Sequence, residues 1–154
     1  GVRGVRTARV NSIHRGHFAR TLLRRGRGGD GPGVVDDQQG CPTAAAGIAA
    51  TLIELAARML GPSPPSGTYH YSGAGVTTWY GFATEIFRVA QAFSGPMPDL
   101  RPITTAQYPL PARRPVNSEL DCGRIARDLG IRPKPWRESL VPVVAQLLGA
   151  RSKG

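Results

Sequence analysis

The sequence predicts an α/β fold, in which short strands alternate with helices. Runs of β-branched, aromatic or other apolar residues at 34–35, 68–72 and 100–104 have the composition of strands. Segments 44–60 and 79–92 carry apolar residues at helical spacing. The chain's 20 glycines and 14 prolines gather mostly between such segments, where they mark loops.

The first third of the chain is basic and rich in glycine. Residues 2–10 predict a weak strand, and residues 17–25 predict a short helix with apolar side chains on one face. The glycine-rich string 26–33 has the composition of a phosphate-binding loop, but it lacks the Lys-Ser/Thr pair and no strong strand precedes it. We therefore expect a turn there.

A long helix is predicted over 44–60, with Thr43 placed to cap its first turn. Alanine, leucine and isoleucine dominate this segment and favour a helix. Apolar residues lie nearly all round it, and Glu54 and Arg58 form an i,i+4 charge pair. We therefore expect much of this helix to be buried.

Three further helices are expected along the rest of the chain. The first covers 79–92, with Thr77 or Thr78 placed to cap it and an apolar stripe at helical spacing. A short helix follows over 124–129, and an amphipathic helix begins at Trp136.

The net charge of +10 is concentrated near the start, because residues 1–30 hold eight arginines and one acidic residue. Such a cluster can bind nucleic acid, but Phe18 is the only aromatic residue in it, so a platform for stacked bases is missing. We expect no nucleic-acid partner. The sequence shows neither a run of about 18 apolar residues nor an apolar signal core, so we expect no membrane partner and a cytoplasmic location.

The two cysteines, Cys41 and Cys122, lie far apart in the sequence, and neither belongs to a Cys-x-x-Cys motif. This spacing argues against a zinc site and against a redox motif. We expect both thiols to be reduced, and a disulfide between them is the lesser alternative.

The most distinctive segment is the proline-rich stretch 109–121, which holds Arg113 and Arg114 between prolines. Proline fixes its own φ and disfavours helix in the residue before it, so this backbone should be stiff and extended. Each guanidinium offers a planar fork of donors that suits carboxylate or phosphate. We predict that Arg113 and Arg114 hold an anionic ligand; the alternative is a structural loop in which one arginine pairs with an acidic residue.

Polar residues beyond the strand 34–35 form a second candidate group. Asp36, Asp37 and Gln38 follow that strand directly, where ligands often bind in α/β proteins, and we expect contacts with a sugar or a base. Asn117 and Ser118 are further candidates, which either bind the ligand or cap the following turn. The adjacent carboxylates suggest a metal, but no third ligand is evident, so we predict no metal site.

Five sequence blocks, with Trp136-Arg137-Glu138 after them, carry a family resemblance. The blocks are Arg6-Thr7 with Val10; Val34-Val35-Asp36-Asp37-Gln38 with Gly40 and Pro42-Thr43; Gly67-Thr68-Tyr69-His70; Thr78-Trp79-Tyr80 with Phe82-Ala83 and Glu85-Ile86-Phe87; and Ile103-Thr104-Thr105 with the segment 108–121. In this order they resemble the C-terminal half of the dTDP-4-dehydrorhamnose reductase family, within the extended short-chain dehydrogenase/reductase superfamily. The match covers nearly the whole chain.

The resemblance implies an oxidoreductase of dTDP-rhamnose biosynthesis, which reduces dTDP-4-dehydro-6-deoxy-L-mannose to dTDP-L-rhamnose with NADPH or NADH. It implies that the dinucleotide loop and the catalytic Tyr-x-x-x-Lys pair belong to a missing N-terminal half. Neither feature occurs here: none of Tyr69, Tyr71, Tyr80 and Tyr108 has a lysine four residues later. We therefore predict no catalytic residue in this chain and no activity for the chain alone.

The resemblance also implies roles for parts of the chain. The double arginine would hold the diphosphate of the dTDP-sugar substrate. Residues 1–33 would end the dinucleotide-binding domain, 34–150 would form mainly the small α/β substrate-binding domain, and 151–154 would be a tail. A strand at about 67–72 would return to the Rossmann sheet. Without the first half, unpaired strand edges and an uncovered apolar face should make the chain poorly soluble.

The chain departs from the family pattern at Arg9 and Asn11, where relatives carry aromatic residues. Ala46 and Gln146 stand where some members bind Mg through glutamates, so we expect no Mg-bridged dimer. Two alternative functions stay open. One is a non-catalytic relative on the same scaffold, like the regulatory subunit of methionine adenosyltransferase, and the other is a basic nucleic-acid-binding module over residues 1–27.

Overall fold

The computed structural model describes residues 2–6, 10–11, 18–28, 31–109, 111 and 114–149, with only the backbone described for 2–6 and 10–11. The elements run in the order β1 Val2–Arg6, β2 Val10–Asn11, α1 Phe18–Arg25, η1 Gly26–Gly28, β3 Gly33–Val35, β4 Gln39–Gly40, β5 Thr43–Ala44, α2 Ala45–Met59, β6 Gly67–His70, β7 Thr77–Thr78, α3 Trp79–Gln91, β8 Arg101–Ile103, η2 Thr105–Gln107, α4 Gly123–Leu129 and α5 Trp136–Gly149. The predicted α/β class is confirmed. None of the helices in this described part is long and apolar enough to cross a membrane.

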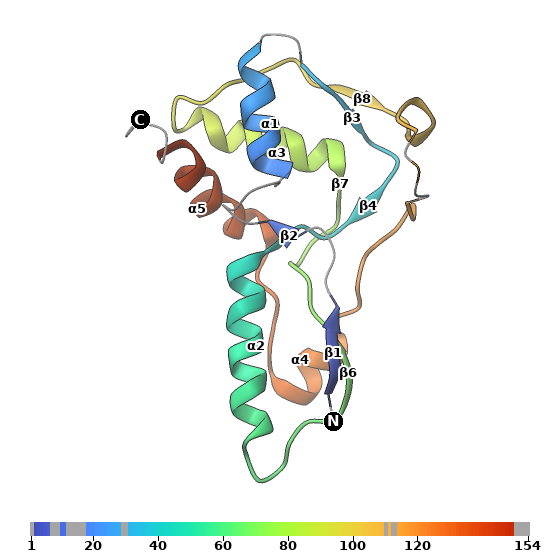
Figure 1. Ribbon diagram of the computed structural model, residues 1–154, viewed down its shortest axis with the longest axis vertical. Coiled ribbons are helices and arrows are strands. Elements are labelled where there is room, and N and C mark those ends of the chain that lie inside the picture. The colour runs from blue at the N-terminus through green and yellow to red at the C-terminus, as the bar shows by residue number, and fades with distance from the viewer. Residues whose placement is uncertain are drawn as a thin grey trace.

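The molecule is elongated and has two lobes, which lie at the top and the bottom of Figure 1. The upper lobe holds α1, α3 and α5, with strands β3 and β8 at its edge. The lower lobe holds α2, α4 and the pair of β1 with β6. Each lobe has its own cluster of buried apolar side chains.

The strands pair two by two. β1 pairs with β6, β2 with β5 and β3 with β8, all in parallel, whereas β4 and β7 are antiparallel. Parallel neighbours need a crossover connection, usually with a helix. The long connection between β1 and β6 includes α2, which runs alongside the pair in Figure 1.

Helix α3 is the centre of the upper lobe. The hydroxyl of Thr78 caps it by accepting a hydrogen bond from the Gly81 nitrogen at 2.9 Å, as predicted. Phe82 has no exposed surface, and its ring stacks on Phe18 of α1 with centroids 5.8 Å apart. Trp136 of α5 meets the same ring edge-on at 5.5 Å. These aromatic contacts fix α1, α3 and α5 against one another.

Helix α2 is less buried than the sequence suggested. Thr51 and Leu55 are its only buried residues, whereas Ile53 is 71% exposed and Leu60, just after the helix, is 90% exposed. The prediction of a largely buried helix is wrong for this chain, because α2 packs against the lower lobe on one side only. Leu52, Ile53 and Met59 of α2 are exposed on its open side.

Thr43 does not cap α2, which corrects the prediction. Ala44 holds the N-cap position and makes no side-chain cap bond. The Thr43 hydroxyl instead donates to the Cys41 carbonyl at 3.0 Å and accepts from the Gly73 nitrogen at 3.1 Å. Thr43 therefore ties the chain before α2 to the chain after β6.

Helix α4 ends at Leu129 as predicted and begins at Gly123, one residue before the predicted start. The carboxylate of Asp121 accepts a hydrogen bond from the Gly123 nitrogen at 2.7 Å. The helix is followed by Gly130 in the left-handed conformation, with φ of 69°. Glycine suits this position because it has no Cβ to clash with the carbonyl.

The domain boundary at residue 33 stays a prediction. Helix α1 precedes that boundary in the sequence, yet its buried residues Ala19, Leu22 and Leu23 belong to the same apolar cluster as α3 and α5. By packing, α1 is part of the upper lobe.

Candidate functional site

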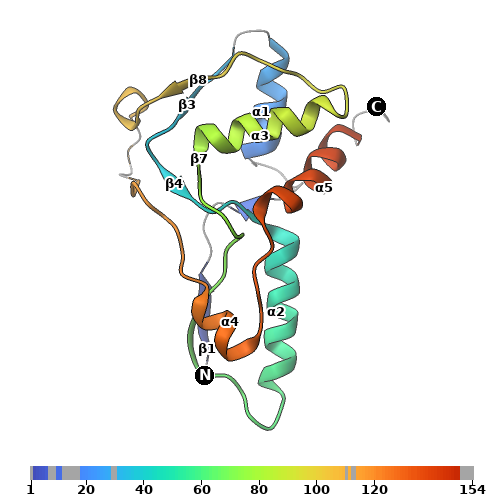
Figure 2. The ribbon, with the colours of Figure 1, turned by 180° about the vertical axis from the view of Figure 1, so that it is seen from behind.

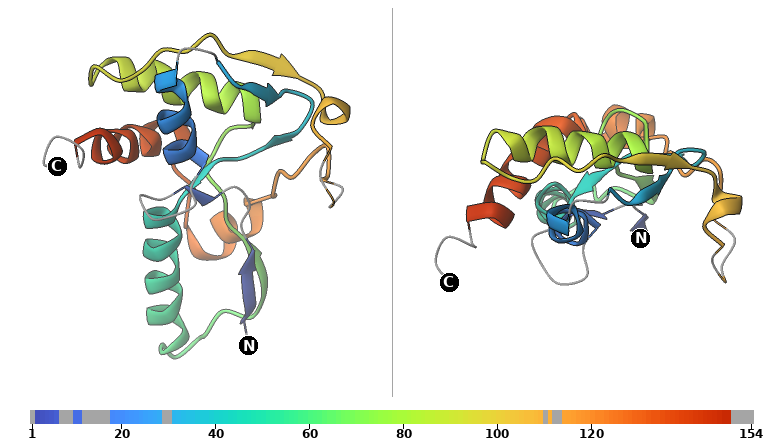
Figure 3. Two further views of the ribbon diagram at one scale, coloured as in Figure 1. Left: turned by 45° about the horizontal axis from the view of Figure 1, so that its top comes forward. Right: turned by 90° about the horizontal axis from the view of Figure 1, so that it is seen from above.

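A cavity of about 1000 Å³ opens in the upper lobe between α1, β3 and the segment after η2. Seen from behind, the β3–β8 pair and the following loop extend away from α1 (Figure 2). Seen from above, α1 lies beside α3, and the β3–β8 pair lies farther to the right (Figure 3, right). Apolar side chains line much of the cavity, including Phe18, Val34 and Trp79.

The charge of this cavity is positive. Arg25, at the end of α1, and Arg114, on the proline-rich loop, both line it, and no aspartate or glutamate is among the described residues that line it. An apolar hollow lined by cations attracts an anionic ligand that also has apolar surface.

Arg114 lines the cavity beside Pro111 and Pro115, whereas Arg113 lies outside the described residues. The ion pairs found in the described part of the chain join Arg58 with Glu54, Arg88 with Glu85 and Arg124 with Asp128. No carboxylate described here therefore neutralises Arg114.

Asp36 anchors the start of α3. Its carboxylate accepts a hydrogen bond from the Thr78 hydroxyl at 2.6 Å, while the oxygen of that hydroxyl caps α3. The backbone nitrogen of Asp36 donates to the Ile103 carbonyl at 2.9 Å. Since Trp79 follows Thr78 directly, Asp36 helps to hold the indole that lines the cavity.

Asp37 anchors η2 in the same way. Its carboxylate accepts from the Thr105 hydroxyl at 2.6 Å and from the Thr105 nitrogen at 2.9 and 3.0 Å. The hydroxyl bond, and after it the backbone bond, hold the pKa of Asp37 below its ordinary value.

The side-chain amide of Gln38 is oriented by its contact with the Thr105 hydroxyl. Its Nε2 donates to the Thr105 hydroxyl oxygen at 3.0 Å. The single hydroxyl proton of Thr105 goes to Asp37, which as a carboxylate can only accept, so the oxygen is left to accept from Gln38. Gln38 is only 7% exposed and lines the cavity, as does Thr105.

Asn117 lies in a turn next to the cavity. Its Oδ1 accepts from the Glu119 nitrogen at 2.8 Å, and its backbone forms a parallel bridge with Gln39. It is not among the lining residues, but Ser118 is. The nitrogen and hydroxyl of Ser118 both donate to the Gln39 carbonyl at 2.9 Å.

The structure thus brings Arg114 and Gln38 to one cavity and places Asp36 and Asp37 behind its walls. Ser118, a candidate from the sequence, lines the cavity, whereas Arg25, Thr105 and Tyr108 line it without having been selected from the sequence. Arg25 belongs to a helix with several arginines. The sequence therefore indicated that this helix is basic, but not which of its arginines faces the cavity. Thr105 and Tyr108 lie in a family block, which could have drawn attention to them.

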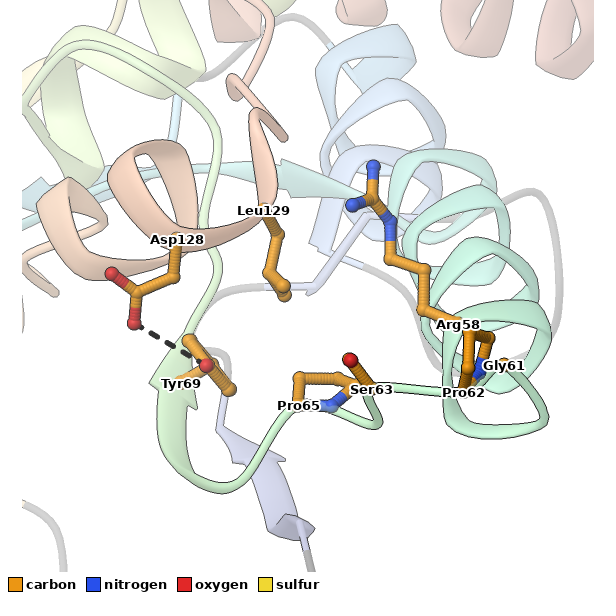
Figure 4. A pocket seen from close by; sticks show the side chains of 8 residues that line it. All are labelled: Arg58, Gly61, Pro62, Ser63, Pro65, Tyr69, Asp128 and Leu129. Atoms are coloured by element: carbon orange, nitrogen blue, oxygen red, sulfur yellow. Dashed lines mark hydrogen bonds between the residues drawn. The ribbon is translucent and has the colours of Figure 1, made fainter.

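A second, smaller hollow of about 400 Å³ lies in the lower lobe (Figure 4). Tyr69 and Asp128 meet on one side of it, where the phenol donates to the carboxylate at 3.3 Å, and Arg58 stands on the other side. Arg58 is already paired with Glu54 at 2.6 Å, and Asp128 with Arg124 at 3.2 Å. Because Arg58 and Asp128 are already in ion pairs, this hollow is a weaker candidate for binding a charged ligand than the upper cavity.

Metal-ligating side chains do not gather in the described part of the chain, where no three His, Cys, Asp or Glu residues lie together. The Nδ1 atom of His70, on β6, is buried without a hydrogen-bond partner among the described residues.

Residues 3–148 match the model of a protein family described as the RmlD substrate binding domain. The chain belongs to this family. It is 39% identical over 146 residues to a dTDP-4-dehydrorhamnose reductase of Sinorhizobium fredii, covering 94% of this chain and 49% of that protein. It is also 39% identical over 139 residues to a reductase of the same name from Aggregatibacter actinomycetemcomitans, covering 88% and 47%.

Solved structures agree with this assignment. A dTDP-4-dehydrorhamnose reductase of Clostridium acetobutylicum matches with a TM-score of 0.83 and 31% identity, covering 93% of this chain and 48% of that one. The reductase of Bacillus anthracis, solved in complex with NADP, matches with a TM-score of 0.82 and 27% identity, covering 92% and 47%. The chain thus spans about half the length of these relatives, and the family resemblance seen in its sequence is confirmed.

Proposed function

We propose that this chain is the substrate-binding part of a dTDP-4-dehydrorhamnose reductase and that its upper cavity holds the dTDP-sugar. The observation that carries the proposal is the cavity itself, which Arg114 lines without a carboxylate among the other described lining residues. Its apolar walls suit the thymine and the deoxysugar, and the guanidinium suits the diphosphate. Membership in a substrate-binding family supports the same ligand.

The individual residues then have distinct roles. Arg114, with Arg113 next to it, binds the diphosphate, and the prolines on either side limit the motion of the loop. Gln38 offers its oriented amide to the sugar or the base, and Asn117 is a further candidate contact. Asp36 and Asp37 contribute through the threonines that they hold, because their carboxylates are already bonded.

The groups that carry out the reduction belong to another part of the enzyme. Reduction of a ketone by hydride needs a nicotinamide and a proton donor, and the sequence contains no Tyr-x-x-x-Lys pair. We propose NADPH as the cofactor, by analogy with the Bacillus anthracis relative and its NADP. We also propose that β1, β6 and the open side of α2 join the cofactor-binding domain, which would supply the strands and apolar surface that they lack.

Binding of dTDP to this chain tests the proposal by titration calorimetry. A charge-assisted hydrogen bond is worth roughly 1.5–3 kcal/mol, so Arg114→Gln should weaken dTDP binding by about 10- to 100-fold. Arg132→Gln is the matched control, since it removes the same charge from an exposed position outside the cavity. Thymidine, which has no phosphate, should bind equally to both variants.

Two results would contradict the proposal. One is a dTDP affinity that does not change in Arg114→Gln. The other is an equal loss in Arg132→Gln, which would show that only the overall positive charge matters.

A further inference from the structure

The two cysteines lie close together in the folded chain, although they are far apart in the sequence. Both are free thiols. Cys41 lies between β4 and β5 and is only 4% exposed. Cys122 holds the N-cap position of α4 and is partly exposed. The cavity and the proposed reaction use neither of them.

The two thiols share the Ser72 hydroxyl as a neighbour. The sulfur of Cys122 lies 3.5 Å from the Ser72 hydroxyl and 3.6 Å from the Leu120 carbonyl, to which it donates. Hydrogen bonds from the same Ser72 hydroxyl and from the backbone of Leu120 also act on the Cys41 thiol, where they oppose the rise in its pKa that burial causes. Both sulfur atoms therefore lie beside Ser72.

The backbone around the thiols is held in place on both sides. Gln39 and Asn117 form a parallel bridge, and the Ser118 nitrogen donates to the Gln39 carbonyl at 2.9 Å. From this bridge, one segment leads from Gln39 to Cys41 and the other leads from Asn117 to Cys122. The Gly73 nitrogen, next to Ser72, donates to the Thr43 hydroxyl at 3.1 Å and fixes the third segment.

We propose that Cys41 and Cys122 form a redox-sensitive pair, which closes into an intramolecular disulfide when the chain meets a disulfide oxidant such as oxidised glutathione. Bond formation requires both sulfur atoms to leave Ser72 and to turn toward each other by rotation about their Cα–Cβ bonds. A disulfide then has a bond of about 2.05 Å between Cβ atoms about 3.8 Å apart.

The exchange takes place in two steps. The thiolate of the more exposed Cys122 attacks a sulfur of oxidised glutathione, which forms a mixed disulfide and releases one glutathione thiolate. The thiolate of Cys41 then attacks the Cys122 sulfur and releases the second glutathione. Two electrons pass from the cysteine pair to the glutathione disulfide, and the two thiol protons end on the two reduced glutathiones.

Closure by Cys41 is the slower step. Burial raises the pKa of the Cys41 thiol, and only the thiolate is nucleophilic. The rate of closure should therefore rise with pH through the alkaline range, and the mixed disulfide should accumulate at lower pH.

The disulfide would stabilise the wall of the upper cavity. Gln38 precedes Cys41 and Ser118 precedes Cys122 by a few residues, and both line that cavity. Because the bond closes a long loop, oxidation should raise the melting temperature by about 10 °C. This inference does not depend on the identity of the ligand.

The test incubates the native 154-residue chain with oxidised glutathione and follows its intact mass. We expect a monomer that has lost two hydrogen atoms, and a peptide map in which Cys41 is joined to Cys122. Cys41→Ser should stop at the glutathione adduct of Cys122, and Cys122→Ser should react much more slowly because only the buried thiol is left. Dithiothreitol should reverse both the mass change and the gain in melting temperature.

Three results would overturn the proposal. They are a wild-type chain that keeps the glutathione adduct at alkaline pH, a disulfide between two chains, and a Cys41–Cys122 bond that forms only in denaturant. Circular dichroism of each variant before oxidation separates a folded chain that fails to close from one that has lost its fold.

Discussion

Replacing Thr78 with alanine removes both hydrogen bonds of the hydroxyl group at the start of α3. That hydroxyl accepts from the Gly81 nitrogen at 2.9 Å and donates to the Asp36 carboxylate at 2.6 Å. One bond caps the helix and the other joins it to the end of β3. The change therefore tests whether Asp36 acts as an anchor for the wall of the cavity.

The expected magnitude follows from these two bonds. Loss of a threonine cap costs about 1 kcal/mol, and loss of an exposed side-chain hydrogen bond costs about 0.5–1 kcal/mol more. For a domain of this size, 1 kcal/mol lowers the melting temperature by roughly 2–4 °C. Thr78→Ala should thus melt about 5 °C below the wild type.

Thermal unfolding followed by circular dichroism measures this shift, with three variants for comparison. Thr78→Ser keeps both bonds and should show little change. Asp36→Ala removes only the second bond and should show less than half of the loss. Thr84→Ala, in the middle of the same helix, removes a hydroxyl that donates to the Tyr80 carbonyl and should not destabilise. Equal melting temperatures for Thr78→Ala and Thr84→Ala would refute the reasoning.

Three further predictions concern the core, a helix end and the pH dependence. Phe82→Ala, at a site with no exposed surface, should lower the free energy of unfolding in urea by about 3–5 kcal/mol; a loss below about 1 kcal/mol would contradict the central place of α3. Gly130→Ala should cost about 1 kcal/mol in the same assay, because φ of 69° strains any residue with a Cβ; an unchanged midpoint would argue against that conformation. The bonds from Thr105 lower the pKa of Asp37 from its ordinary value of 3.8, so their stabilisation is present above that value and is lost as the pH falls through the lower, folded-state pKa. Melting temperatures measured against pH should therefore fall less steeply below pH 3.8 in Thr105→Val than in the wild type, and parallel curves would exclude the effect.

The helices were predictable where local signals are strong. Thr78 followed by an apolar stripe defines α3, and Phe82 and Ile86 of that stripe are fully buried. The burial of α2 was not predictable from its composition, because burial depends on what packs against a helix. Leu52 and Ile53 are as apolar as core residues, yet they lie on the open side.

The candidate site was predictable to a similar extent. The two prolines around the double arginine indicated a stiff, anion-facing loop, and Arg114 does line the cavity. The partners of the two aspartates could not be predicted, because Thr78 lies 42 positions from Asp36 and Thr105 lies 68 positions from Asp37. Only the tertiary fold brings these pairs together.

The central claim is that this chain binds the dTDP-sugar and that the reducing groups lie elsewhere. Its most direct test joins the chain to the N-terminal half of the Sinorhizobium fredii reductase and measures NADPH oxidation with dTDP-4-dehydrorhamnose. We predict reduction by the joined protein, a KM raised about 10-fold or more by Arg114→Gln, and no reduction by the chain alone. Reduction by the chain alone would contradict the claim, as would a joined protein that is folded and binds NADPH but leaves the keto-sugar unreduced.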